Sequence, residues 1–251
     1  MKSKTLLGWA GLIILFVLMF LTAVAFLLAS SRPDEWEPYQ LRNEDQRGVA
    51  NRFGTRIMRE LVNGLGDIKP FSFTIHEEEM NEYLASLDEI AFLAYSKDEV
   101  ARKSSELVAA MDKVGIADPV VDMQPDTLTL MVRTKKGNKI VSLDLVFEFT
   151  DDAWLYVKLD GVRVGLLPLP RGFVSGSLEE VQGAIGGVGG ERNEPSLQDL
   201  DLIVGRLISG IGGKPLPTRL PIVESRPKRI RDIEIDEQTL TIHFVPAPEN
   251  D

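Results

Sequence analysis

The sequence predicts an α+β fold, with an N-terminal transmembrane helix followed by a strongly curved antiparallel β-sheet packed against several helices. Three observations lead to this prediction. Residues 5–31 carry no charge. Apolar residues recur with a helical period in several later segments, and they alternate with a strand period between residues 120 and 166. The alternation changes phase at Gly161, and a phase change of this kind is typical of a bulge that bends a strand.

The uncharged segment is long enough to cross a bilayer as one helix. At about 1.5 Å per residue, roughly 24 apolar residues reach about 36 Å, which exceeds the hydrocarbon thickness of about 30 Å. A cleaved signal peptide is the alternative, with a small-x-small site at 23–25 or 29–31. The first of these sites lies inside the apolar run, and the run before the second is too long for a signal peptide. We therefore expect an uncleaved anchor.

The charges on either side of this segment predict its orientation. Positive residues flank a membrane span on the cytoplasmic side. Lysines precede the segment, and acidic residues dominate after it: Lys2 and Lys4, then Asp34, Glu35 and Glu37. The expected organisation is a cytoplasmic stub and anchor (1–31), a linker (32–43) and an extracytoplasmic α+β domain (44–251).

Composition excludes several kinds of partner and site. The chain has a formal net charge of −10, which disfavours nucleic acid as a partner. It contains no cysteine, so neither a disulfide nor a lipidated cysteine is possible. The segment 225–231 is locally basic. A solvated strand edge and a contact with lipid headgroups explain it equally well.

Helices are expected in the first half of the domain. Residues 44–65 carry an apolar residue at every fourth position, namely Val49, Phe53, Ile57, Leu61 and Leu65. A short extended piece at 71–75 leads into a helix at 77–87, with Thr74 and Glu77 at the spacing of a capping box. The acids at 77–79 suit a helix start and have no second acidic cluster beside them, so we do not assign a metal to them. A further helix is expected at 98–114.

Strands follow. We expect them at 120–123, 128–132, 140–149 and 154–166, with turns at 136–138 and 150–152. In the last strand the alternation shifts at Gly161, where a bulge would return the apolar residues to one face.

The final third combines helices, loops and a hairpin. Helices are expected at 175–184 and 195–211, joined by a glycine-rich loop at 183–195. Pro215, Pro217 and Pro221 then require an extended path. A hairpin with its turn at 236–238 closes the domain.

The search for catalytic motifs is negative. The two histidines, His76 and His243, are expected at opposite ends of the domain and not as an acid–base or metal pair. The segment 172–176 lacks the spacing of a nucleophile elbow, and 212–215 lacks the residues of a phosphate loop. We therefore predict a non-enzymatic protein with no catalytic residue, no metal and no cofactor.

Two segments resemble a known family. Phe71-Ser-Phe-Thr-Ile-His-Glu-Glu-Glu-Met-Asn-Glu-Tyr-Leu84 and Asp160-Gly-Val-Arg-Val-Gly-Leu-Leu-Pro-Leu-Pro170 are similar to segments of YpmS-type proteins, which are bacterial, single-pass, membrane-anchored and extracytoplasmic. His76 stands where that family has a capping threonine, and the glycine-rich loop is extra. The resemblance implies a distant likeness to tubular (TULIP-like) lipid-binding domains. It also implies the bacterial inner membrane as the location, with the N-terminus in the cytoplasm. It supplies no catalytic residue.

Two functions follow as hypotheses. The first is binding of a lipid or other apolar ligand in a groove between the sheet and the helix at 195–211. The candidate groove residues are Val141, Leu143, Leu145, Phe147, Leu155, Val157, Val162, Val164, Val204 and Leu207. The alternative is a membrane-tethered interaction or scaffold module, with an envelope protein as its partner and no small-molecule site.

Overall fold

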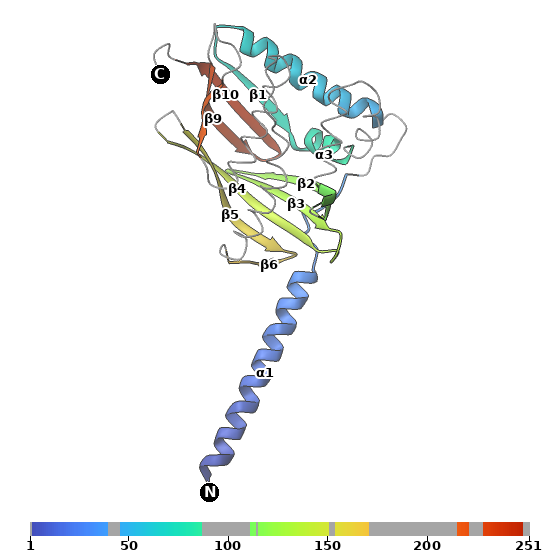
Figure 1. The fold of residues 1–251 in the computed structure, drawn as a ribbon, viewed down its shortest axis with the longest axis vertical. Coiled ribbons are helices and arrows are strands. Elements are labelled where there is room, and N and C mark those ends of the chain that lie inside the picture. Colours follow the sequence, from blue (N-terminus) through green and yellow to red (C-terminus); the bar gives the residue numbers. More distant parts are fainter. Residues whose placement is uncertain are drawn as a thin grey trace.

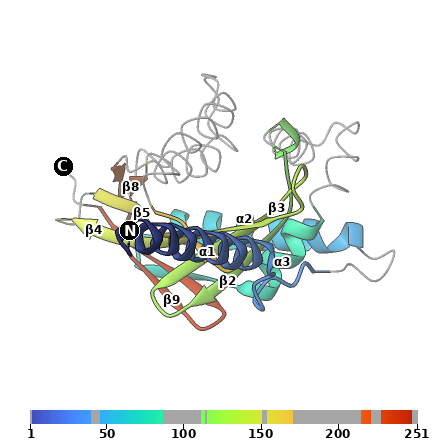
Figure 2. The same cartoon turned by 90° about the horizontal axis from the view of Figure 1, so that it is seen from below.

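The computed structural model describes residues 2–39, 46–86, 111–113, 115–150, 154–170, 215–220 and 228–247. Within these residues the fold is α+β, with antiparallel sheets and few helices. One sheet lies above the other in Figure 1, and the first helix leaves the domain below the lower sheet. Figure 2 shows this helix in front of the domain when the molecule is seen from below.

Helix α1 (Lys2–Ser30) is the first element. In the part of the chain that the structure describes, no helix is both long enough and apolar enough to cross a membrane. After α1 the chain turns along the domain. Trp36 is buried there with Val120, Met131 and Ile140. The described part of the expected linker therefore packs against the domain.

Helix α2 (Gln46–Gly66) confirms the helix expected at 44–65. Four residues of its apolar stripe pack against the main core, namely Phe53, Ile57, Leu61 and Leu65. Helix α3 (Glu77–Ala85) also begins where expected. The position of its capping box was wrong, because strand β1 continues through His76. Thr74 pairs with Thr241 in the sheet, and Glu79 accepts the N–H of His76 at 3.3 Å.

The upper sheet brings the two ends of the domain sequence together. It has the order β1 (Phe71–His76), β10 (Thr239–Pro246), β9 (Lys228–Asp236) and β8 (Arg219–Leu220). The closing hairpin β9–β10 is confirmed, with its turn at 237–238. The expectation of a single curved sheet was wrong. The hairpin pairs with β1, and this pairing of distant segments has no local signal in the sequence.

The lower sheet is the expected meander. Its order is β2 (Ile116–Gln124), β3 (Thr127–Thr134), β4 (Ile140–Thr150), β5 (Trp154–Val164) and β6 (Leu167–Pro168), and β7 (Leu216–Pro217) pairs with β5. The register between β4 and β5 shifts next to Gly161, which confirms the bulge. Because of this shift, Leu145 faces Leu159 and Leu143 faces Val162, so the apolar residues of β5 stay on one face.

Gly161 has a second role at the bulge. A Cβ at this position would meet the carboxylate of Asp144. Asp144 accepts hydrogen bonds from Thr129 Oγ1 (2.9 Å) and from Arg163 Nη2 (3.0 Å). The missing side chain therefore leaves room for a charged group that links three strands.

Helix α3 covers the edge of the lower sheet. Asn81 accepts the N–H of Val121 at 2.7 Å and donates to the carbonyl of the same residue at 2.8 Å. Glu77 accepts the N–H of Met123 at 2.7 Å, and the Met123 carbonyl accepts the N–H of Gln238 at 3.1 Å. These side chains occupy the hydrogen-bonding positions that a further strand would take, so β2 is not an open edge.

Helix α1 contacts the opposite side of the same sheet through its main chain. The N–H of Leu166 donates to the carbonyl of Leu28 at 2.9 Å. Gly165 has a positive φ of 58°. A Cβ there would lie 3.0 Å from the carbonyl carbon of Ala29, and closer still to the carbonyl oxygens of Leu28 and Ser31. Only glycine allows the turn between β5 and β6 to approach the helix end this closely.

Several expectations lie outside the described residues. They are the turn at 150–152 beyond Thr150, the helices at 175–184 and 195–211, and the glycine-rich loop. Of the helix at 98–114, only 111–113 is described, and it is helical.

Candidate functional site

The expected groove residues of β4 and β5 share one face of the lower sheet. The register pairs Val141 with Val164, Leu143 with Val162, and Phe147 with Val157. Strand β3 extends this face, because Leu130 faces Leu143 and Val132 faces Val141. The sequence analysis missed the contribution of β3. Val204 and Leu207, the residues expected on the facing helix, lie outside the described residues.

The part of this face nearest the upper sheet is filled by protein. Leu145, Leu155, Val157 and Leu216 form one buried cluster. Leu155 is only 2% exposed. Phe147 and Phe149 join this cluster to the main core, which contains Phe73, Leu240 and Phe244 from the upper sheet. These residues of the expected groove therefore act as core residues.

The end of the face nearest α1 is only partly covered. Val141, Leu143 and Val164 are half-buried, whereas Val162 is buried. Since Gly165 contacts the last turn of α1, the pair Val141 and Val164 lies close to the helix end. Apolar surface is therefore partly exposed beside the end of α1.

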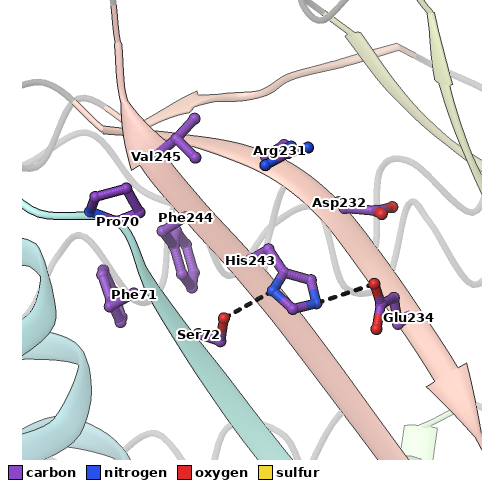
Figure 3. A pocket seen from close by; sticks show the side chains of 9 residues that line it. All are labelled: Pro70, Phe71, Ser72, Arg231, Asp232, Glu234, His243, Phe244 and Val245. Atoms are coloured by element: carbon purple, nitrogen blue, oxygen red, sulfur yellow. Dashed lines mark hydrogen bonds and ion pairs between the residues drawn. The ribbon is translucent and has the colours of Figure 1, made fainter.

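The described residues form a pocket of about 320 Å³ on the upper sheet. Strands β1, β9 and β10 supply its lining, which mixes apolar and charged side chains (Figure 3). The lining residues are Pro70, Phe71, Ser72, Arg231, Asp232, Glu234, His243, Phe244 and Val245. Strand β1 begins at the end of the domain opposite α1, so this pocket lies far from the helix (Figure 1).

His243 is the central polar residue of the pocket. Its Nδ1 lies 2.7 Å from Ser72 Oγ, and its Nε2 lies 3.3 Å from Glu234 Oε1. Figure 3 shows the three side chains in a row across β1, β10 and β9. The second distance is that of an ion pair when the ring is protonated, since Nε2 makes no directed hydrogen bond among the described residues.

This row has the composition of a catalytic triad but a different arrangement. In a serine hydrolase the serine bonds Nε2 of the histidine and the carboxylate bonds Nδ1. Here the two ring nitrogens have exchanged partners. Ser72 is exposed, whereas a nucleophile of that type reacts in a site that excludes water and offers oxyanion donors. The row therefore lacks the arrangement of a serine-hydrolase triad.

The sequence analysis missed this pocket and misplaced the histidines. His76 and His243 lie on neighbouring strands and not at opposite ends of the domain, because β1 pairs with β10. They are still apart in register, since His243 faces Ser72 and His76 faces Thr239. Alternation along β10 could have indicated that His243 shares a face with Thr241. The pairing with Ser72, 171 residues away, has no local signal.

Metal binding finds no support among the described residues, where no group of three acidic or histidine side chains gathers. The acids at the start of α3 have structural roles instead. Glu79 pairs with Arg56 at 2.5 Å, and Glu77 bonds the edge of β2. Burial raises the pKa of Glu77 above its usual 4.5, the hydrogen bond from Met123 opposes this, and the charge of Asp122 adds to it.

A comparison of the chain with models of protein families, with curated proteins and with solved structures gives no match.

Proposed function

We propose that this chain is a non-enzymatic envelope protein, anchored in the bacterial inner membrane by α1, whose domain serves as an interaction module outside the cytoplasm. The anchor is supported by the uncharged run at 5–31 and by the charges that flank it. A further argument comes from the described part of α1. Its large apolar side chains project without protein cover, for example Phe16, Phe20 and Phe26, which are 61–68% exposed. Exposed apolar surface of this extent requires an apolar partner or solvent.

The main-chain junction between α1 and the lower sheet is the observation that carries the proposed role. A simple tether needs no contact between its helix and its domain. Here the Leu166 N–H bonds the helix end, and the absence of a side chain at Gly165 permits the approach. A junction of this kind fixes the direction in which the domain points. Fixed direction is useful to a protein that must present one surface to a partner at a set distance from the membrane.

The surface that the junction directs away from α1 carries the pocket around His243. It combines exposed polar groups with the apolar side chains of Pro70, Phe71 and Val245. Exposed polar groups around a small apolar centre are typical of protein interfaces. We therefore assign this face to a protein partner in the envelope.

Topology is the first test of this proposal. Protease added to intact spheroplasts should degrade the domain and leave a fragment that contains α1. Full protection of the domain would overturn both the location and the proposed role.

Lipid binding is the second candidate, and one observation favours it. The apolar face of β3, β4 and β5 is only half-buried at Val141 and Val164, which lie at the α1 end. A lipid tail that left the bilayer beside α1 would reach this end first. The TULIP-like resemblance of the sequence points in the same direction.

One experiment separates the two candidates. A photoreactive amino acid is placed in the full chain at position 231, beside the pocket, or at position 164, on the apolar face. An adduct with a specific protein at 231 and none with lipid at 164 supports the interaction module. Lipid adducts at 164, with no protein adduct at 231, would replace it with the lipid-binding role. Gly66, exposed at the end of α2, provides the control position.

A further inference from the structure

The turn between β3 and β4 carries three lysines within five residues. They are Lys135, Lys136 and Lys139. Lys135 and Lys136 are exposed, and Lys139 is half-buried. The segment is positively charged, whereas the whole chain has a formal net charge of −10.

This turn lies against the end of α1. The ammonium group of Lys139 donates to Ser30 Oγ at 2.5 Å and lies 5.2 Å from the centre of the Phe26 ring. Ser30 is the last residue of the helix. Figure 1 shows the β3–β4 connection at the lower end of the domain, where the helix leaves it.

The length of the helix gives the depth of this turn in a bilayer. About 20 helical residues span a hydrocarbon core of roughly 30 Å, so the 27 uncharged residues exceed the core by about 5 Å at each end. The headgroup layer on each side is about 5–7 Å thick. Ser30 then lies in the headgroup layer, and the lysine that contacts it lies at the same depth.

We propose that the β3–β4 turn, residues 135–139, is a contact surface for anionic lipid headgroups of the membrane that holds α1. The inference rests on the proposed anchor. Lys136 and Lys139 supply the positive charge. Lys135 is also paired with Asp112, which reduces its contribution. Asp34 and Glu35 follow α1 on the path along the domain and oppose the attraction. The contact is therefore modest in strength and depends on salt.

The contact has a geometric consequence. The junction at Gly165 and the contact of Lys139 with Ser30 both join the domain to the end of α1. The lysine turn adds a contact with the membrane itself, on a different hairpin of the same sheet. Together these contacts hold the lower sheet at one inclination to the bilayer.

The test uses the full chain, which contains no cysteine. Gly137→Cys places a thiol in the turn and leaves all three lysines in place. The turn should tolerate this substitution, because a Cβ at position 137 makes only ordinary contacts, the nearest at 3.5 Å. Gly66→Cys is the matched control at the far end of the domain, where a Cβ meets nothing within 4 Å. Each variant receives a fluorophore and is reconstituted into vesicles. The vesicles consist of phosphatidylcholine alone or of phosphatidylcholine mixed with phosphatidylglycerol, with a headgroup-attached quencher.

The expected result is quenching at position 137 that increases with phosphatidylglycerol, and no such increase at position 66. Replacing Lys136 and Lys139 by Gln should lower the ratio of docked to undocked domains by about fivefold for each lysine removed. High salt should have the same effect as these replacements.

The possible failures are distinguishable. If the wild-type chain is extracted from the vesicles by alkaline carbonate, the proposed anchor is wrong. If the chain resists extraction but position 137 is quenched no more than position 66, the anchor stands and the headgroup contact is wrong. If quenching at position 137 changes neither with the phosphatidylglycerol content nor with the lysine replacements, the proposed headgroup contact is also wrong.

Discussion

Two helices contact the lower sheet in different ways. Helix α1 contacts the turn between β5 and β6 through main-chain atoms, with Leu28 accepting from Leu166. Helix α3 contacts the edge of β2 through side chains, with Asn81 and Glu77 bonding the backbone of Val121 and Met123. The first contact tolerates many residues in the helix but demands glycine in the turn. The second depends on the identity of two helix residues, and one of them titrates.

The largest effect is expected where the main-chain contact is broken. Gly165→Val places a β-branched residue at a positive φ and against backbone atoms of Leu28, Ala29 and Ser31 at the end of α1. A left-handed conformation costs about 1–2 kcal/mol and overpacking about 1–3 kcal/mol, so the junction should lose roughly 4 kcal/mol. Hydrogen exchange at the Leu166 amide should become fast. Gly137→Val, in a turn without positive φ or close contacts, is the control. Unchanged protection of Leu166 would show that the junction is not a main-chain contact.

The side-chain contact should be nearly as sensitive. Asn81→Ala leaves the N–H and the carbonyl of Val121 without their partner, and Val121 is only 3% exposed. Each unsatisfied group costs about 1–3 kcal/mol, so the free energy of unfolding should fall by about 3 kcal/mol. Chemical denaturation measures this. Asn63→Ala, on the exposed side of α2, is the matched control and should change little. Equal effects of both substitutions would contradict the role of Asn81.

Gly161→Val tests a third site, between the two helices. The new side chain would meet the carboxylate of Asp144, which Thr129 and Arg163 hold in place. Overpacking next to a held charge should destabilise the domain by about 2 kcal/mol. For a domain of this size, this corresponds to a fall of roughly 4–8 °C in Tm. The double variant with Asp144→Ala frees the space and should recover part of the loss. If the single variant melts no lower than the wild type, the bulge does not depend on glycine.

The smallest effect is a pH dependence that only the α3 contact should show. Burial raises the pKa of Glu77 above 4.5, so the folded state binds a proton more tightly than the unfolded state. The stabilisation from this proton is complete below pH 4.5 and is lost as the pH rises through the raised pKa. Glu77→Gln should flatten this part of the curve of stability against pH. Glu78→Gln, at the exposed neighbouring position, should leave the curve unchanged. A curve for Glu77→Gln that matches the wild type would exclude Glu77 as its source.

The sequence predicted features that depend on nearby residues. The stripe of α2 and the hairpin β9–β10 follow from local periodicity, and the bulge at Gly161 follows from a phase change within one strand. The capping box was misplaced by two residues, because pairing with β10 extends β1 through His76. The pairing of β1 with β10 is a tertiary effect, and a local capping pattern in the sequence cannot indicate it.

Features that join distant segments could not be predicted in this way. The pocket requires Ser72 and His243 to be neighbours, and the division into two sheets requires β1 to pair with β10. The groove prediction identified a real apolar face, but it did not show that Leu155 and Val157 are buried in one cluster with Leu145 and Leu216. Alternation identifies the inner face of a strand. It does not distinguish a filled interior from an open one.

The bond between Leu166 and Leu28 also has a consequence for biosynthesis. The helix is made first, and the carbonyl of Leu28 and the hydroxyl of Ser30 gain partners that the ribosome adds much later. Lys139, which follows Ser30 by 109 residues, and then Leu166 have to emerge before the helix end is complete. If α1 enters the bilayer as it is made, the rest of the domain folds against a helix end that is already in place. The membrane would then act as the surface on which the lower sheet is assembled.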